Sequence, residues 1–299
     1  MKLSVCIPVY NIEVFDLVSA LRTEIQQANL DAEIILIDDA SENNIQLINS
    51  KCEALVDQFF VLDQNIGRSK IRNLFLQYAK GEYLIFLDCD GLVQNDSFLQ
   101  DYLQFIGQNT DVKVLYGGRT VTSEKPEEKY ILRWKYAHQR ENPSLEKRID
   151  KPYLSFQTNN FLIAKNVFHS NNFDIQFSKY GYEDLVFAMK LKEKGIFIHH
   201  FENPIFNNDL DENSFYLKKV EESVINLSSI TSEKELLDQL SEIKILKAYS
   251  TLKRLGTEQW VYFVLRPFRG LFVRNLLSRN PSIRMLDFYK LFLLIKVSK

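Results

Sequence analysis

Two aspartates separated by one residue follow an apolar run of the chain. Asp88 and Asp90 end the segment LIFLDCDG, and in extended backbone both carboxylates would point to one side, with Cys89 on the other. Two carboxylates on one side repel each other unless a cation lies between them. Mn²⁺ or Mg²⁺ suits this place, because one or two carboxylates hold such an ion while phosphate oxygens and water complete its coordination. The alternative is a pair of turn-forming aspartates helped by Gly91.

A second acidic pair, Asp38 and Asp39, ends another apolar run and is followed by Ser41. These residues suit a turn and the N-cap of the next helix. They equally suit hydrogen bonding to the edge of a nucleobase at the mouth of a sheet. The pattern alone leaves both interpretations open.

Arg68 and Arg72 lie four residues apart on a predicted helix, opposite its apolar side, with Asn65 and Gly67 just before the first turn. Such a pair is commonly a solvated basic face. The alternative is that both guanidinium groups, with the N-terminus of the helix, face a diphosphate.

Glu183 and Asp184 form a third acidic pair at the start of a predicted helix over residues 182–194. Acidic residues are common there because they complement the helix dipole. Adjacent carboxylates can also raise the pKa of one partner while the helix end lowers that of the other, which is how a general base is tuned. The sequence does not separate these effects.

The elements that position these residues follow from the alternation of short apolar runs and helical patterns, which is typical of βαβ units around a parallel sheet. No Gly-x-Gly-x-x-Gly follows the first strand, which argues against a dinucleotide fold. Ligands of such sheets bind beyond the carboxyl ends of the strands, where Tyr10, Asn11 and the first two acidic pairs stand. The predicted strands cover residues 3–7, 33–37, 59–62 and 83–87, and the predicted helices cover 14–28, 45–55 and 68–80, the last ending at a C-cap, Gly81.

The rest of the chain has a looser pattern. Strands are predicted over 112–117, 160–164 and 196–200, and helices over 130–140, over 182–194 with a stop at Gly195, and from residue 214 to the end. We therefore expect an α/β fold, a doubly wound, mixed and mainly parallel sheet with helices on both faces, followed by a C-terminal helical appendage.

Composition narrows the class of protein. With 299 residues and 45% hydrophobic residues, the chain can bury a full core. No apolar run is long enough for a membrane-spanning helix, and the N-terminus lacks the features of a signal peptide, so we expect a cytoplasmic protein. Three dispersed cysteines indicate neither disulfides nor a zinc site. The net charge of −2 hides a basic C-terminus, because residues 244–299 hold 12 Lys and Arg against Glu258 and Asp287.

Six segments in this order resemble the motif series of family-2 glycosyltransferases, which have a GT-A fold, and the likeness extends over residues 1 to about 220. The segments are SVCIPVYN, LIDDAS, NIGRSKIRN, GEYLIFLDCD, FQTNNF and YGYEDLVFAMKLKEKG. The resemblance implies a catalytic domain over residues 1–220, divided into a nucleotide-sugar half, 1–110, and an acceptor half, 111–220. Residues 221–299 would then form a separate basic helical region.

The resemblance also implies roles for individual residues. Asp90 would be the direct ligand of Mn²⁺ or Mg²⁺, with Asp88 beside it, and Asp184 would be the base of an inverting transfer, with Glu183 as its neighbour. The nucleotide pocket would be lined by Pro8, Tyr10, Asp38, Asp39, Arg68, Arg72 and Asp88, and the sugar and acceptor would be bordered by Asn159, Asn160 and Tyr182. One departure concerns the metal site, since Asn207 stands where the family often has a histidine. His199 and His200 lie nearby, but on a strand they would face opposite ways.

The expected partners are a nucleotide-sugar donor, preferably a UDP-sugar, and a saccharide or lipid-linked acceptor in cell-surface polysaccharide synthesis. The basic residues of 244–299 alternate with aromatic ones, which favours contact with an anionic membrane, here the inner face, over docking onto a protein. Nucleic acid is not expected, because the body of the chain is acidic. The alternatives are a nucleotidyltransferase, whose glycine- and lysine-rich phosphate loop is missing, and a catalytically silent nucleotide-sugar-binding module, which Asn207 would favour.

Overall fold

The computed structural model describes residues 2–175, 181–207, 210–231, 237, 240 and 242–298. The packing of the chain divides it into two compact units. Unit 1 contains the described parts of Met1–Thr122, Ser144–Ser178 and Lys190–Asp209, and unit 2 contains those of Ser123–Pro143, Lys179–Met189 and Leu210–Lys299. These units are defined by packing, whereas the expected catalytic domain over residues 1–220 is defined by function. That domain stays a prediction.

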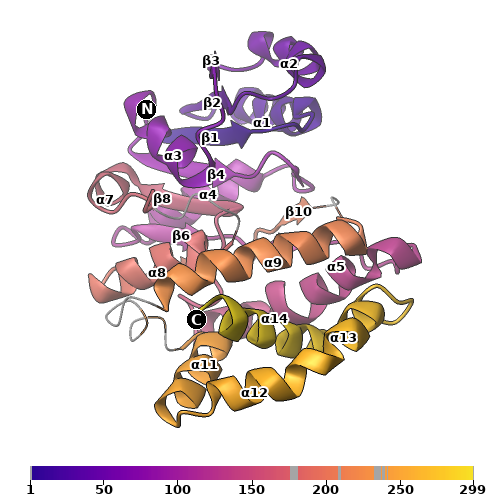
Figure 1. The fold of residues 1–299 in the computed structure, drawn as a ribbon. Coiled ribbons are helices and arrows are strands. Elements are labelled where there is room, and N and C mark those ends of the chain that lie inside the picture. The colour runs from indigo at the N-terminus through magenta and orange to yellow at the C-terminus, as the bar shows by residue number, and fades with distance from the viewer. Residues whose placement is uncertain are drawn as a thin grey trace. The chain divides into compact units, whose positions relative to one another are not determined.

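Unit 1 is built on a seven-stranded sheet with the order β3-β2-β1-β4-β8-β6-β9 (Figure 1). The first four strands of the chain are mutually parallel, β8 is antiparallel to both of its neighbours, and β9 is parallel to β6. The predicted mixed, mainly parallel sheet is confirmed. The strands are β1 (Leu3–Val9), β2 (Ala32–Asp38), β3 (Gln58–Val61), β4 (Tyr83–Leu87), β6 (Val114–Tyr116), β8 (Asn160–Ala164) and β9 (Ile198–His200).

Helices cover both faces of this sheet, which is why all but one residue of each of β1, β4 and β8 is buried. Alternate side chains of β1 and β2 pack with α1 (Phe15–Gln27) and α4 (Phe98–Gln108) in one core cluster. On the other face, the Phe86 ring meets Phe75 of the 3₁₀ helix η2 (Phe75–Gln77) and Phe168 of α7 (Lys165–Ser170). The alternation of side chains along each strand therefore fills two cores, one on each face.

The chain reverses direction across the sheet between β1 and β4. It runs from β1 outward to β2 and β3, and then returns to the opposite side of β1 as β4. The β1–β4 pairing stops at Cys6, two residues before Pro8, which has no N–H to donate. The carboxyl ends of β1 and β4 thus border the point where a doubly wound sheet holds its ligands.

A small three-stranded sheet lies in the same unit. Its strands are β5 (Gly91–Leu92), β7 (Arg119–Thr120) and β10 (Ile205–Asn207), with β10 in the centre. The register sets Asn207 opposite Gly91. Strands of two or three residues have no periodicity to detect, so the sequence did not predict this sheet.

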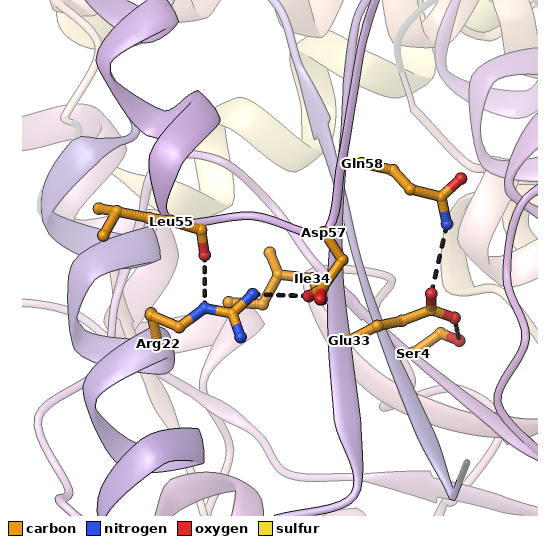
Figure 2. Close-up of polar contacts among 7 residues, drawn as sticks. All are labelled: Ser4, Arg22, Glu33, Ile34, Leu55, Asp57 and Gln58. Carbon is orange, nitrogen blue, oxygen red and sulfur yellow. Dashed lines mark hydrogen bonds and ion pairs between the residues drawn. The ribbon is translucent and has the colours of Figure 1, made fainter.

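Two polar clusters join the strands at the amino end of the large sheet (Figure 2). The buried carboxylate of Glu33 accepts hydrogen bonds from Ser4 Oγ at 2.6 Å and from Gln58 Nε2 at 3.3 Å. In the second cluster, Asp57 accepts from the Arg22 guanidinium at 2.6 Å and from the Ile34 N–H at 2.8 Å. Strand and helix ends at this edge are therefore bonded to one another.

Gly81 has a different role from the predicted C-cap. The last helical residue before it is Gln77, and a Cβ on Gly81 would lie 2.6 Å from Ser4 N. Its own N–H donates to Ser4 Oγ at 2.8 Å. Glycine is thus required for close approach to β1. By contrast, Gly195 follows α8 with a φ of 66° and ends it as predicted.

The remaining helices of unit 1 are short, and α8 continues from unit 2 into unit 1. The predicted helix over 45–55 is an α-helix followed by a 3₁₀ turn, and the one over 68–80 ends earlier than predicted. The elements are α2 (Asn43–Asn49), η1 (Ser50–Ala54), α3 (Arg68–Leu74), α6 (Leu145–Asp150) and α8 (Glu183–Glu193).

Unit 2 is helical, and α14 (Ile283–Val297) is its central element. Leu286, Tyr289 and Phe292 of this helix are buried where it packs against its neighbours. The predicted helical C-terminus is confirmed for the described residues; residues 232–236, 238, 239 and 241 lie outside them. The other elements of unit 2 are η3 (Glu128–Tyr130), α5 (Ile131–Tyr136), the π-helical turn η4 (Ala137–Glu141), α9 (Asn213–Ile230), α11 (Lys244–Arg254), α12 (Glu258–Leu265), η5 (Arg266–Phe268) and α13 (Arg269–Leu276). Every helix among the described residues falls short of the length and apolar character that a membrane span requires.

Candidate active site

The loops after β1 and β2 hold each other at the carboxyl edge of the large sheet. The Asn11 N–H donates to Ser41 Oγ, and Asn11 Oδ1 accepts from the Glu42 N–H, both at 2.8 Å. Asn11 has a φ of 54°, a left-handed conformation that asparagine tolerates better than most residues. This turn leaves the ring of Tyr10 half exposed at the end of β1, and Pro8 partly exposed just before it.

Asp38 and Asp39 are both buried at the end of β2. Asp39 accepts hydrogen bonds from the N–H groups of Ile66 at 2.7 Å and Gly67 at 3.0 Å, which ties β2 to the loop before α3. Burial raises the pKa of Asp39, and these two bonds oppose the rise. One oxygen of Asp38 accepts from the Ser41 N–H at 2.6 Å, and its Oδ2 has no hydrogen-bond partner among the described residues.

The interpretation of this pair as a helix cap is wrong. The cap position of α2 is Glu42, whose side chain makes no capping hydrogen bond within the described structure. Asp38 instead accepts from an N–H group of the loop before α2, and Asp39 accepts from N–H groups of the loop before α3. Their predicted contact with a nucleobase stays a prediction, for which Asp38 Oδ2 is the acceptor still available.

Asp88 and Asp90 lie in a turn after β4, and not in the extended backbone that the sequence suggested. Gly91 N–H donates to Asp88 O at 3.1 Å, which closes the turn. Asp88 Oδ1 forms an ion pair with Arg72 Nη2 at 2.7 Å. Cys89, between the aspartates, has its pKa raised to about 12, chiefly by burial, so it stays a neutral thiol.

Arg72 is not on a solvated face. Its side chain is 2% exposed, and its guanidinium lies over the Phe173 ring at 5.7 Å as well as against Asp88. Arg72 is buried together with Ser69 and Ile71 of the same helix, which corrects the prediction that it lies opposite the apolar side. Arg68 is exposed, and its positive charge helps to lower the pKa of Asp90. The two arginines therefore face different surroundings.

Asp90 is the less satisfied of the two aspartates. Its Oδ1 is buried and has no hydrogen-bond partner among the residues the structure describes. Burial and the charge of Asp88 raise the pKa of Asp90, while the Asn207 side chain and Arg119 lower it. Asn207, at 5% exposure, reaches this place through the β5–β10 pairing, and its own Oδ1 also lacks a partner in the described part of the chain.

This arrangement suits a hard divalent cation. Asp90 Oδ1 and Asn207 Oδ1 are two buried oxygens with unused acceptor capacity within the described residues, and their side chains are hydrogen-bonded to each other. Oxygen is the ligand atom that Mg²⁺ and Mn²⁺ prefer. Within the described residues no group of three or more His, Cys, Asp or Glu forms a candidate metal site. His200 is not a substitute, because its Nε2 donates to Pro152 O at 2.9 Å.

Asn159 and Asn160 join the aspartate turn to β8. The Asp88 N–H donates to Asn159 O at 3.1 Å. The Asn160 amide nitrogen donates to Gly118 O and Asn203 O, and its Oδ1 accepts from Tyr102 Oη at 2.7 Å. This internal bonding indicates that Asn160 positions its neighbours, and it disfavours direct contact of Asn160 with a sugar. The predicted contact of Asn159 and Asn160 with the sugar and acceptor stays a prediction.

The third acidic pair belongs to unit 2, where an unusual backbone precedes α8. Gly181 has a φ of 97° and Tyr182 a φ of 72°, and the latter is rare for a bulky residue. A Cβ on Gly181 would lie 2.7 Å from Ser223 Cβ of α9, and the Asn226 amide donates to Gly181 O at 2.7 Å. The bend thus packs against α9 and fixes where α8 begins.

The acidic pair itself follows this bend directly. Glu183 is buried, and the partly exposed Asp184 accepts from the Leu185 N–H at 2.8 Å. Tyr182 has its pKa raised by burial. Strained backbone next to a carboxylate is a frequent feature of functional sites.

Arg119 was missed in the sequence. It lies on β7, and its charge lowers the pKa of Asp90. The preceding glycines gave a signal, since Gly118 has a φ of 98° and a Cβ on Gly117 would collide with Tyr102 Oη at 2.3 Å. The two adjacent glycines before Arg119 were therefore a sign, visible in the sequence, of a tightly packed turn, but the prediction of site residues did not take them into account.

Comparison with known proteins decides the family. The model of Glycosyl transferase family 2 matches residues 4–170, more than half of the chain. The chain belongs to this family. As a family-2 glycosyltransferase it is an enzyme, and the match includes both aspartate pairs of unit 1 as well as Asn159 and Asn160.

Individual glycosyltransferases give a finer comparison. Chondroitin synthase of Pasteurella multocida (strain Pm70) is 27% identical over an alignment of 266 residues. The match covers 74% of this chain and 27% of that protein. The chain spans less than half of the length of the curated relatives it matches. Each of these matches therefore covers only part of the relative concerned.

Solved structures share the fold at low sequence identity. S. aureus TarS 1-349 in complex with UDP-GlcNAc matches with a TM-score of 0.53 and 17% identity, over 100% of this chain and 90% of that one. Mannosyltransferase PcManGT from Pyrobaculum calidifontis, in complex with GDP-Man and Mn²⁺, matches with a TM-score of 0.55 and 12% identity, over 98% and 85%. The α/β sheet with its C-terminal helices is thus a GT-A-like architecture.

Proposed function

We propose that this glycosyltransferase moves a sugar from a nucleotide-sugar, preferably a UDP-sugar, to a saccharide or lipid-linked acceptor in cell-surface polysaccharide synthesis. The observation that carries the proposal is the pair of buried, unsatisfied oxygens of Asp90 and Asn207 at the carboxyl end of β4, within the described structure. The likeness to chondroitin synthase supports the class of product, and TarS in complex with UDP-GlcNAc supports the donor.

The proposed donor site uses the residues of unit 1. Asp90 and Asn207 would hold Mn²⁺ or Mg²⁺, and when bound the cation would neutralise charge on the departing diphosphate. The ion pair with Arg72, at 2.7 Å, would fix the carboxylate of Asp88 next to this site. Pro8, Tyr10, Asp38 and Asp39 would border the nucleoside, and Arg68, which is exposed, would face the phosphates.

The proposed chemistry is an inverting displacement. The acceptor oxygen forms a bond to the anomeric carbon as the bond from that carbon to the diphosphate oxygen breaks, and Asp184 takes the proton from the acceptor hydroxyl. Glu183 and Tyr182 would position Asp184, and Asn159 would border the sugar. We expect the enzyme to act in the cytoplasm, at the inner face of the membrane.

A donor panel tests the function. UDP and GDP binding would be titrated with and without Mn²⁺ or Mg²⁺, and nucleotide release would then be followed from UDP-sugars and GDP-mannose. We expect UDP to bind with metal dependence and at least one UDP-sugar to be hydrolysed slowly. Nucleotide binding without any turnover, on a panel of donors and saccharide acceptors, would instead indicate a silent binding module.

Asp184 is tested separately. Asp184→Asn should reduce transfer by about a hundredfold to ten-thousandfold, because it removes the base, while leaving UDP affinity unchanged. Glu193→Gln, at the exposed far end of the same helix, is the matched control and should retain full turnover. Near-normal turnover of the Asp184 variant would disprove this assignment.

A further inference from the structure

The stretch from α12 through η5 to α13 in unit 2 has one side that packs on the protein. The Tyr262 ring stacks on Phe292 of α14, with centroids 5.4 Å apart. Phe272 and Leu276 of α13 are buried. These contacts fix which side of the stretch faces the unit and which side faces outward.

The outward side is apolar. Trp260 is 69% exposed and Phe263 62% exposed, although both are among the most hydrophobic side chains. Five large exposed side chains recur at spacings of three or four residues, with two of them adjacent, and so form a single row. We name this row the aromatic stripe; it consists of Trp260, Phe263, Val264, Phe268 and Leu271. Water-facing surfaces seldom carry so continuous an apolar row unless something binds it.

Basic residues surround the stripe. Five positive side chains on or next to these helices are exposed: Lys253, Arg254, Arg266, Arg269 and Arg274. The acidic residue Glu258 is the only one between residues 244 and 276, and its side chain is not among the exposed ones. An apolar row with a positive border complements a surface that is apolar inside and anionic outside.

We propose that the aromatic stripe binds in the interface of an anionic lipid membrane, with Trp260 and Phe263 inserted at the level of the headgroups. Trp favours this depth because its ring is apolar and its N–H remains hydrated. The flanking arginines and lysines bind lipid phosphates. A second copy is a poorer occupant, because a two-fold contact would place the positive border against itself. This binding is independent of sugar transfer.

Vesicle flotation tests the proposal with the full chain. We expect binding to large vesicles of phosphatidylcholine with 30% phosphatidylglycerol, and little binding to pure phosphatidylcholine. Trp260→Ser combined with Phe263→Ser should weaken the partition coefficient by at least about tenfold, since two apolar side chains leave the interface. Arg266→Gln with Arg274→Gln should weaken it by about fivefold per charge and reduce its salt dependence.

Matched controls separate the possible outcomes. Phe215→Ser removes an exposed aromatic of α9 outside the stripe and should leave vesicle binding unchanged. Asp90→Asn should bind vesicles as the wild type does, so a failure of the proposed transferase reaction would not affect this result. The proposal is overturned if anionic vesicles are not bound, if the Trp260 and Phe263 double variant binds equally well, or if that variant instead abolishes a dimer seen in sedimentation.

Discussion

The two ends of the large sheet differ in how completely their buried carboxylates are hydrogen-bonded. At the amino end, Glu33 is buried but accepts hydrogen bonds from Ser4 and Gln58 (Figure 2). It also accepts one from the Lys80 N–H. At the carboxyl end, Asp90 is held in a turn with one oxygen that has no partner in the described part of the chain. The same chemical group therefore stabilises the fold at one end and is left available for a ligand at the other.

This difference indicates where stability was given up for function. A buried carboxylate with full hydrogen bonding is tolerated, whereas an unsatisfied one is destabilising unless something binds it. The pKa of Asp90 is raised by burial and by Asp88, which is the electrostatic sign of that destabilisation. We therefore expect substitution of Asp90 to lower activity without lowering stability, and substitution of Glu33 to lower stability without lowering activity.

The largest effect is expected for Asp90→Asn. We expect transfer to fall by about a thousandfold, because the principal oxygen for the cation loses its charge. The thermal midpoint without metal should stay the same or rise, since a buried charge without full bonding has been removed. Thermal unfolding and turnover, measured on the same preparation, check both parts. A clear loss of stability would contradict the comparison.

The amino end should respond in the reverse way. Glu33→Leu should lower the free energy of unfolding by about 2–4 kcal/mol, because three donors lose their acceptor. Glu33→Gln keeps an acceptor in place and is the milder control. Denaturant unfolding measures the loss, and turnover of the remaining folded protein should be unaffected. An unchanged midpoint for the leucine variant would show that this network is dispensable.

A smaller effect is expected at Asn207. Asn207→His replaces an oxygen by an imidazole nitrogen, so Mn²⁺ should bind about tenfold more tightly relative to Mg²⁺. Calorimetric titration of each metal in the presence of UDP measures this ratio without depending on turnover. Asn207→Ala removes the amide oxygen and should weaken the binding of both metals. An identical metal ratio in the wild type and the histidine variant would show that Asn207 does not contact the cation.

The smallest effect concerns His200, a buried residue at the carboxyl end of the edge strand β9 and not one of the carboxylates compared here. Burial lowers its pKa to about 4, so the folded state keeps it neutral. The unfolded chain binds the proton below its ordinary pKa of 6.5, so stability should fall as the pH is lowered from 6.5 towards 4. The slope should be on the order of 1 kcal/mol per pH unit. His200→Phe should flatten it, while exposed His169→Gln should not.

Much of the fold could be predicted from local patterns. The strands at Tyr83–Leu87 and Asn160–Ala164 were predicted with the bounds the structure has, because strong apolar runs end there at polar residues. The positions of Asp38 and Asp90 at strand ends followed directly. Local pattern failed for Gly81, whose role depends on Ser4, 77 residues away.

The sequence by itself determined the alternating elements, the parallel half of the sheet, and the acidic residues that follow β2 and β4. Only the tertiary structure decided which aspartate is neutralised and which is left available. Arg72 reaches Asp88 because α3 packs against β1, the strand paired with β4. Asn207 reaches Asp90 through a pairing of two short strands more than 100 residues apart. Such partners are set by packing and register, which no local periodicity records.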